Sequence, residues 1–146
     1  MNLISAVQSS LLQYVGIHGR ACRSEYWWFI LFTWILIGFV RLVFGEGVEL
    51  IVIFVILFPK ISVSIRRSHD INISGWWILP YLIIYFLVLA ETLVPTGTYS
   101  FPHLIFVYMA IGAVYIYLYT KKGDVGGNRY GADPLAVEAD VDVSQT

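Results

Sequence analysis

The residues best suited to chemistry are concentrated in one polar stretch of the chain, residues 66–77. This stretch contains Arg66, Arg67, His69, Asp70 and Ser74. A histidine or a carboxylate can serve as a general acid or base, and arginines bind phosphate through paired hydrogen bonds. His69 and Asp70 are neighbours in sequence, so on a helix they point in different directions, and an acid–base role requires a partner from another segment. Ser74 is predicted to act as the N-cap of the helix that follows it.

Two other segments carry side chains of the same kinds. They contain Arg20, Arg23 and Glu25 near the start of the chain, and Asn128, Arg129 and Asp133 near its end. If the three segments meet, their arginines could clamp a phosphate or a lipid headgroup. Equally, Glu25, Asp70 and Asp133 could pair with those arginines and lock the structure at that point. The sequence leaves a ligand site and a structural ion-pair network both open.

Metal and disulfide chemistry are not indicated by the sequence. Cys22 is the single cysteine, which excludes a disulfide framework. His18, His69 and His103 are far apart in sequence, and no spacing typical of a metal site appears. We therefore predict no metal site, no cofactor and no assignable catalytic residue.

The composition indicates what kind of protein must position these residues. Of the 146 residues, 58% are hydrophobic and only 13% are charged, and the mean hydropathy is +0.74. A soluble domain carries about 25% charged residues. The composition therefore excludes an ordinary soluble domain, a disordered protein and a nucleic-acid-binding module. We expect an integral membrane protein whose surroundings are the lipid bilayer, with no nucleic-acid partner.

Four apolar stretches are long enough to cross a bilayer, which requires about 20 helical residues. They cover residues 26–44, 48–65, 76–93 and 101–119. These stretches are apolar on every side, which is typical of membrane helices, although Pro59 and Lys60 interrupt the second one. Short connections at residues 45–47 and 95–102 force neighbouring helices to be antiparallel. The predicted fold class is an all-α integral membrane protein, a bundle of four antiparallel transmembrane helices.

The distribution of basic residues predicts the orientation of this bundle. Eight of the nine lysines and arginines fall on one side, and only Arg41 lies near the other side, where Glu46, Glu49 and Glu91 are found. Because positive charge accumulates on the cytoplasmic side of membrane proteins, both termini are predicted to be cytoplasmic. The middles of the four stretches contain no ionisable group, which argues against ion-coupled transport.

The two ends of the chain differ from the apolar stretches. Residues 1–17 predict an amphipathic helix, with Leu3, Ile4, Val7, Leu11, Tyr14 and Val15 on one face. This helix either lies in the cytoplasmic interface or packs on the end of the bundle. Residues 123–135 are rich in Gly, Asn and Asp, which predicts an ordered cytoplasmic turn segment. Residues 136–146 are predicted to form a mobile tail.

Three motifs together resemble a known family. They are Gly19-Arg20-x-x-Arg23-x-Glu25-Tyr26-Trp27, Arg66-Arg67-x-His69-Asp70-x-x-x-Ser74-Gly75-Trp76-Trp77 and Gly126-x-Asn128-Arg129-Tyr130-Gly131-x-Asp133-Pro134-Leu135. In this order they resemble the bacterial inner-membrane family catalogued as domain of unknown function 805, over about residues 10–135. The resemblance implies a small multi-spanning protein of the bacterial inner membrane, and it supplies no activity.

Three functional hypotheses are compatible with these patterns. The first is a non-enzymatic membrane protein whose polar cytoplasmic face binds a protein partner or an anionic lipid headgroup. The second is a membrane-embedded enzyme acting on a lipid or polyprenyl-phosphate substrate, with His69 or Asp70 as acid or base. The third is an accessory subunit of a channel or transporter. The sequence favours the first of these and does not indicate an oligomeric state.

Overall fold

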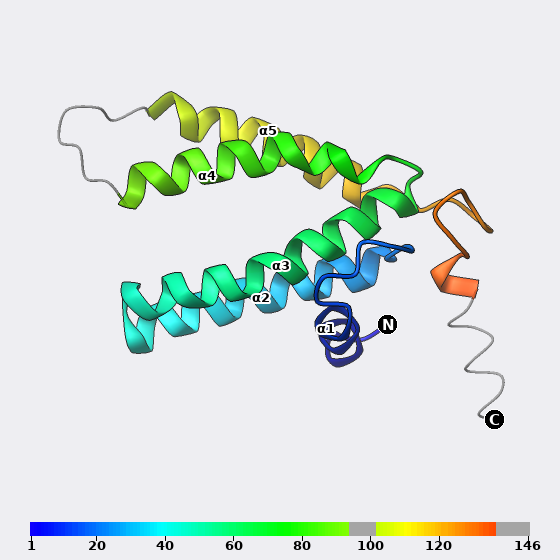
Figure 1. Cartoon of the computed structure of the whole chain (residues 1–146), viewed down its shortest axis with the longest axis horizontal. Coiled ribbons are helices and arrows are strands. Elements are labelled where there is room, and N and C mark those ends of the chain that lie inside the picture. The colour runs from blue at the N-terminus through cyan, green and yellow to red at the C-terminus, as the bar shows by residue number, and fades with distance from the viewer. Residues whose placement is uncertain (94–101, 137–146) are drawn as a thin grey trace. The chain divides into compact units, whose positions relative to one another are not determined.

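The structure is a computed structural model that describes residues 1–93 and 102–136 (Figure 1). Within these residues every regular element is a helix. The α-helices are α1 (Leu3–Leu12), α2 (Arg23–Phe44), α3 (Glu46–Asp70), α4 (Leu79–Leu93) and α5 (Pro102–Thr120), and a 3₁₀ helix, η1, covers Gly75–Ile78. The predicted all-α class is therefore confirmed for the described residues. Most of the predicted loop at 95–102 and nearly all of the predicted tail at 136–146 lie outside them.

The chain forms two compact units, which we describe separately. The first comprises residues 1–75 and 122–136 and contains α1, α2 and α3. The second comprises residues 76–121 and contains α4 and α5. In the second unit, the hydroxyls of Tyr81 on α4 and Tyr108 on α5 lie 2.8 Å apart, and the Tyr81 ring also contacts Tyr115. Tyrosines therefore line the contact between α4 and α5.

Helices α2 and α3 form a tight hairpin in the first unit (Figure 1). Gly45 alone separates them, with φ at 80°, a conformation that glycine adopts without steric cost. Across this turn Arg41 pairs with Glu46 at 3.0 Å and with Glu49 at 2.9 Å. The predicted tight turn at residues 45–47 is confirmed.

The two helices of the hairpin are long and apolar enough to cross a membrane, with mean hydropathies of 2.0 and 2.3 over their best windows. At 1.5 Å per residue they span about 33 Å and about 38 Å, against about 30 Å of hydrocarbon in a bilayer. The buried residues of α2 recur every three or four positions, as at Tyr26, Phe29 and Thr33, and Ile56 and Val63 are buried on α3. The apolar helices of the second unit, Gly75–Ala90 and Leu104–Thr120, are shorter within the described residues.

Helix α3 is longer than the sequence indicates. The apolar stretch at 48–65 places Arg66, Arg67, His69 and Asp70 in a connection, but α3 continues to Asp70. The last two turns of α3 consist mostly of polar residues, and most of these residues are buried. These turns are therefore helical although they lack the apolar residues that predict a span. The physical reason is that partners from distant segments pair with these charges, as described below.

Pro59 lies inside α3 without ending it. A proline lacks the N–H that would donate to the carbonyl four residues earlier, which is the carbonyl of Val55. The hydroxyl of Tyr14, which follows α1, donates a hydrogen bond to this Val55 carbonyl, and the Tyr14 ring lies against Phe58. A buried or membrane-embedded carbonyl requires such a donor. Tyr14 thus compensates for the hydrogen bond that Pro59 removes.

Candidate functional site

The polar residues of the first unit meet where α2 begins and α3 ends. We call this region the basic face and define it as residues 20–25, 66–75 and 122–136. It contains six lysines and arginines against four carboxylates. At its centre is a buried group, which we call the arginine cluster, consisting of Arg20, Glu25, Arg66, Arg67 and Asp70. The three segments that the sequence predicts to meet are therefore brought together.

Arg20 connects the end of α3 to the segment that follows α5. Its guanidinium lies 2.9 Å from the Asp70 carboxylate, and both side chains are nearly inaccessible to solvent. The same guanidinium donates to the carbonyls of Asp124 and Gly126. The backbone N–H of Asp124 also donates to the Asp70 carbonyl at 2.8 Å. Arg20 thereby binds the Gly-rich turn segment to the end of α3.

Asp70 is shared between two arginines and leaves no room beside it. Its second carboxylate oxygen accepts a hydrogen bond from Arg67, one turn earlier on α3. The backbone of Gly123 passes so close that a Cβ atom there would lie 2.1 Å from Asp70 Oδ2. The absence of a side chain at Gly123 therefore allows the C-terminal segment to approach the ion pair.

Arg66 pairs with α2 and, through α2, with α1. Its guanidinium lies 2.8 Å from Glu25 Oε1, and the hydroxyl of Ser9 on α1 donates to the same oxygen at 3.0 Å. Within the described residues, Nε and Nη2 of Arg66 have no hydrogen-bond partner, although the side chain is only 1% exposed. The arginine cluster therefore keeps unpaired donors as well as an excess of positive charge, three guanidinium groups against two carboxylates.

His69 points away from Asp70, as its position on a helix requires. Its Nδ1 lies 3.1 Å from the carbonyl oxygen of Gly19, and because a carbonyl only accepts, Nδ1 carries the proton of this hydrogen bond. The imidazole stacks on Tyr130 with ring centroids 3.9 Å apart and an angle of 4° between the rings. Asn128 donates to the His69 carbonyl at 2.9 Å. His69 thus holds the C-terminal segment against α3.

The remaining predicted site residues lie at the surface of the basic face. Arg23 and Arg129 are exposed, and Arg129 donates to the Asn72 carbonyl at 2.9 Å while lying over the Tyr130 ring. Asp133 forms no ion pair within the part of the chain described. Its carboxylate accepts the backbone N–H groups of Leu135 and Gly126, which hold the pKa of Asp133 below its usual value.

Two predictions about individual residues have different outcomes. Of the three acids that the ion-pair alternative would pair with arginines, Glu25 and Asp70 do so, and backbone N–H groups occupy the carboxylate of Asp133. Ser74 lies directly before η1, where an N-cap must be, and within the described residues no hydrogen bond reaches its hydroxyl. Its capping role stays a prediction.

Several residues of the site are not identifiable from side-chain chemistry in the sequence. They are Ser9, Gly19, Gly123 and Tyr130. Gly19 contributes only a carbonyl and Gly123 only the lack of a side chain, so neither leaves a chemical signal. Tyr130 is part of the third motif, which marks the segment but does not indicate a stack on His69. No group of His, Cys, Asp and Glu able to hold a metal ion is found within the described residues.

The comparison with known families agrees with this arrangement of motifs. A family described as protein of unknown function (DUF805) matches residues 14–132, which include the first two polar segments and the third as far as residue 132. The chain belongs to the DUF805 family. The predicted resemblance is thereby confirmed.

Two relatives extend the comparison to individual proteins. The chain is 33% identical over 136 residues to the Escherichia coli inner membrane protein YhaH, covering 85% of this chain and 91% of the relative. It is 30% identical over 132 residues to the Escherichia coli inner membrane protein YhaI, covering 86% and 92%. No solved structure matches this chain significantly. The DUF805 family thus includes inner membrane proteins, in agreement with the apolar helices.

Proposed function

We propose that this DUF805 protein is a non-enzymatic, four-span protein of the bacterial inner membrane whose basic face lies in the cytoplasm and binds the phosphate headgroup of an anionic lipid. The names of the two relatives support the inner membrane as its location. The lengths and hydropathies of α2 and α3 support two of the four spans. The other two spans would be the apolar stretches at 76–93 and 101–119.

The charges at the two ends of the hairpin support the orientation. At the turn between α2 and α3, Arg41 is neutralised by Glu46 and Glu49. At the other end, lysines and arginines exceed carboxylates by six to four. The end with excess positive charge is the one expected in the cytoplasm.

The excess of positive charge on the basic face is the observation that carries the headgroup proposal. Two of its arginines, Arg23 and Arg129, are exposed and able to contact a phosphate. The buried arginine cluster adds a further positive charge behind them, because three guanidinium groups there face two carboxylates. Anionic lipids of the cytoplasmic leaflet attract such basic surfaces by about 1 kcal/mol for each lysine or arginine.

The same contacts disfavour Asp70 as an acid–base group. Both oxygens of its carboxylate are bound by arginines. A general acid or base must reach the substrate with its titrating atom, and these atoms of Asp70 are engaged with the protein itself. His69 is stacked on Tyr130, and its Nδ1 is hydrogen-bonded to the Gly19 carbonyl, which leaves Nε2 as its titrating atom. The geometry therefore argues against acid–base catalysis by Asp70.

Native mass spectrometry of the purified protein tests the headgroup proposal. We expect the wild type to retain phosphatidylglycerol in preference to phosphatidylcholine. The double variant Arg23→Ala/Arg129→Ala should bind phosphatidylglycerol about thirtyfold more weakly, since each of the two arginines contributes about 1 kcal/mol. The matched control is Arg41→Ala, which removes an exposed arginine at the other end of the hairpin. Equal binding by the wild type and the double variant would refute the proposal, as would equal loss in the control. Retention of a protein in place of lipid would favour a partner-binding surface.

A further inference from the structure

Helix α1 has two faces with opposite environments. Ala6 and Ser10, one turn apart, are completely buried against the rest of the first unit. Elsewhere on the helix Ile4 and Leu11 are 77% and 41% exposed. A helix that packs through small residues and leaves its large apolar residues uncovered is unusual for a protein surface in water. Residues 1–17 also contain no charged side chain.

Specific hydrogen bonds hold α1 on the hairpin of α2 and α3. Ser9 donates to Glu25 of α2 at 3.0 Å. Ser62 of α3 donates to the carbonyl of Gln13 at 2.9 Å. With the contact of Tyr14 to Val55, these bonds hold α1 by its polar side. The exposed apolar residues of α1 therefore take no part in this contact with the hairpin.

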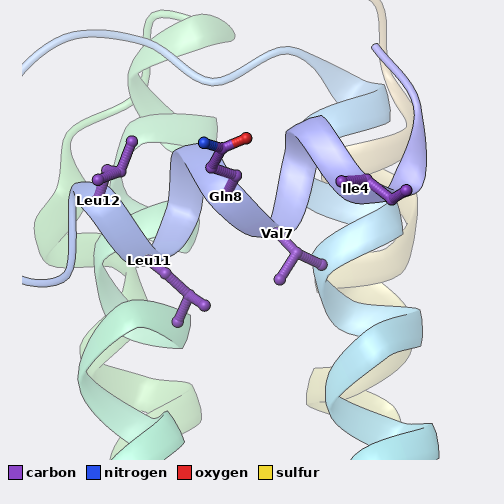
Figure 2. A pocket seen from close by; sticks show the side chains of 5 residues that line it. All are labelled: Ile4, Val7, Gln8, Leu11 and Leu12. Atoms are coloured by element: carbon purple, nitrogen blue, oxygen red, sulfur yellow. The ribbon is translucent and has the colours of Figure 1, made fainter.

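The direction of the apolar side chains indicates what covers them. Figure 2 shows Val7 and Leu11 projecting from one side of α1, the side toward which α2 and α3 extend, and Gln8 and Leu12 projecting from the other. On α2 itself, large apolar side chains such as Leu31 and Trp34 are also exposed. This surface belongs to a helix long and apolar enough to span the membrane.

We propose that α1 lies in the plane of the cytoplasmic membrane interface, with Ile4, Val7 and Leu11 against lipid acyl chains and Gln8 toward water. The occupant of the apolar face is lipid because Val7 and Leu11 point in the direction in which two candidate spans, α2 and α3, extend from α1. An in-plane helix buries its apolar face in the boundary between headgroups and acyl chains. This proposal does not depend on Arg23 or Arg129, so it can be tested independently of headgroup binding.

Spin labels on α1 test the proposal directly in vesicles of phosphatidylethanolamine and phosphatidylglycerol. The single cysteine is first replaced by Cys22→Ala, and labels are then attached in Leu11→Cys and, as the matched control, Gln8→Cys. We expect the label at position 11 to be several-fold more accessible to oxygen, and several-fold less accessible to a water-soluble nickel chelate, than the label at position 8. Ile4→Cys provides a second membrane-side position, where the side chain is so exposed that a label displaces nothing.

Each alternative occupant gives a different result in this experiment. Nickel accessibility at positions 4 and 11 equal to that at position 8 would show that the face is in water, and would overturn the proposal. Protection from both oxygen and nickel would show that protein covers the face, a second copy or another partner, and would overturn it too. Headgroup binding lost while the label accessibilities are unchanged would leave this proposal intact.

Discussion

At the level of single residues, the closest approach in the site is that of Gly123 to Asp70. The Asp70 carboxylate binds Arg20 from the N-terminal segment and Arg67 from its own helix. The backbone of Gly123 lies against the same carboxylate, so close that a Cβ atom would overlap it. One methyl group at this position must therefore displace either the C-terminal segment or the ion pair.

We expect Gly123→Ala to lower the free energy of unfolding by about 1–3 kcal/mol, the usual cost of overpacking a filled site. The control is Gly127→Ala in the same segment, where the nearest atom to a Cβ would be a carbonyl oxygen 3.8 Å away. The measurement is reversible unfolding of both variants in detergent. A Gly123→Ala variant as stable as Gly127→Ala would contradict the close approach seen at Asp70.

How far the site could be predicted differs from residue to residue. The opposite directions of His69 and Asp70 follow from helical geometry alone, and the structure confirms them, with His69 toward Gly19 and Asp70 toward Arg20. The choice between ligand site and ion-pair network does not follow from sequence, because it depends on which charges from distant segments come within bonding distance. The stack of Tyr130 on His69 also could not be predicted, because it depends on two segments far apart in sequence coming together.

At the level of elements, α1 and α3 depend on each other at Pro59. The proline removes the hydrogen bond to the Val55 carbonyl, and Tyr14 supplies a replacement donor from outside the helix. The sequence predicts an apolar stretch over residues 48–65 that Pro59 and Lys60 interrupt, and α3 continues through both residues. The carbonyl that Pro59 leaves without a donor in the helix has a partner in Tyr14, and α3 carries Arg66 and Asp70 to the basic face.

A double-mutant cycle tests this dependence. We expect Tyr14→Phe to cost about 1–3 kcal/mol in the wild type, because it leaves the Val55 carbonyl without its donor. In a Pro59→Ala background the same change should cost clearly less, because the N–H of the new residue can donate to Val55 within the helix. The free energies of unfolding of the four proteins give the coupling. Equal costs of Tyr14→Phe in both backgrounds would show that the hydroxyl does not compensate for Pro59.

The sequence predicts that α1 and α3 are helices, but it does not predict which face of α1 packs or where α3 ends. An amphipathic α1 follows from the spacing of its apolar residues, but the sequence left open whether that face packs inward or outward. The structure uses the small residues Ala6 and Ser10 for packing, which only the position of α1 on the hairpin could determine. Likewise, α3 runs beyond its apolar stretch because buried ion pairs replace apolar packing over its last turns.

At the level of the whole molecule, orientation connects the proposals. Headgroup binding by the basic face requires this face to meet the anionic lipids of the cytoplasmic leaflet. The in-plane position of α1 requires the same end of α2 and α3 to lie at that leaflet. Both follow from the unequal charges at the two ends of the hairpin, where Arg41 is neutralised and the arginine cluster is not. The cytoplasmic location of the basic face is therefore the central claim.

Topology reporters test this claim most directly. We fuse a fluorescent protein that folds only in the cytoplasm, and in parallel a phosphatase that is active only in the periplasm, after Thr146, within residues 95–100 and after Gly47. We expect fluorescence without phosphatase activity at Thr146, and phosphatase activity without fluorescence at the other two positions. Phosphatase activity at Thr146 would place the C-terminus in the periplasm, and fluorescence at Gly47 would place the turn after α2 in the cytoplasm. Either result would contradict a cytoplasmic basic face.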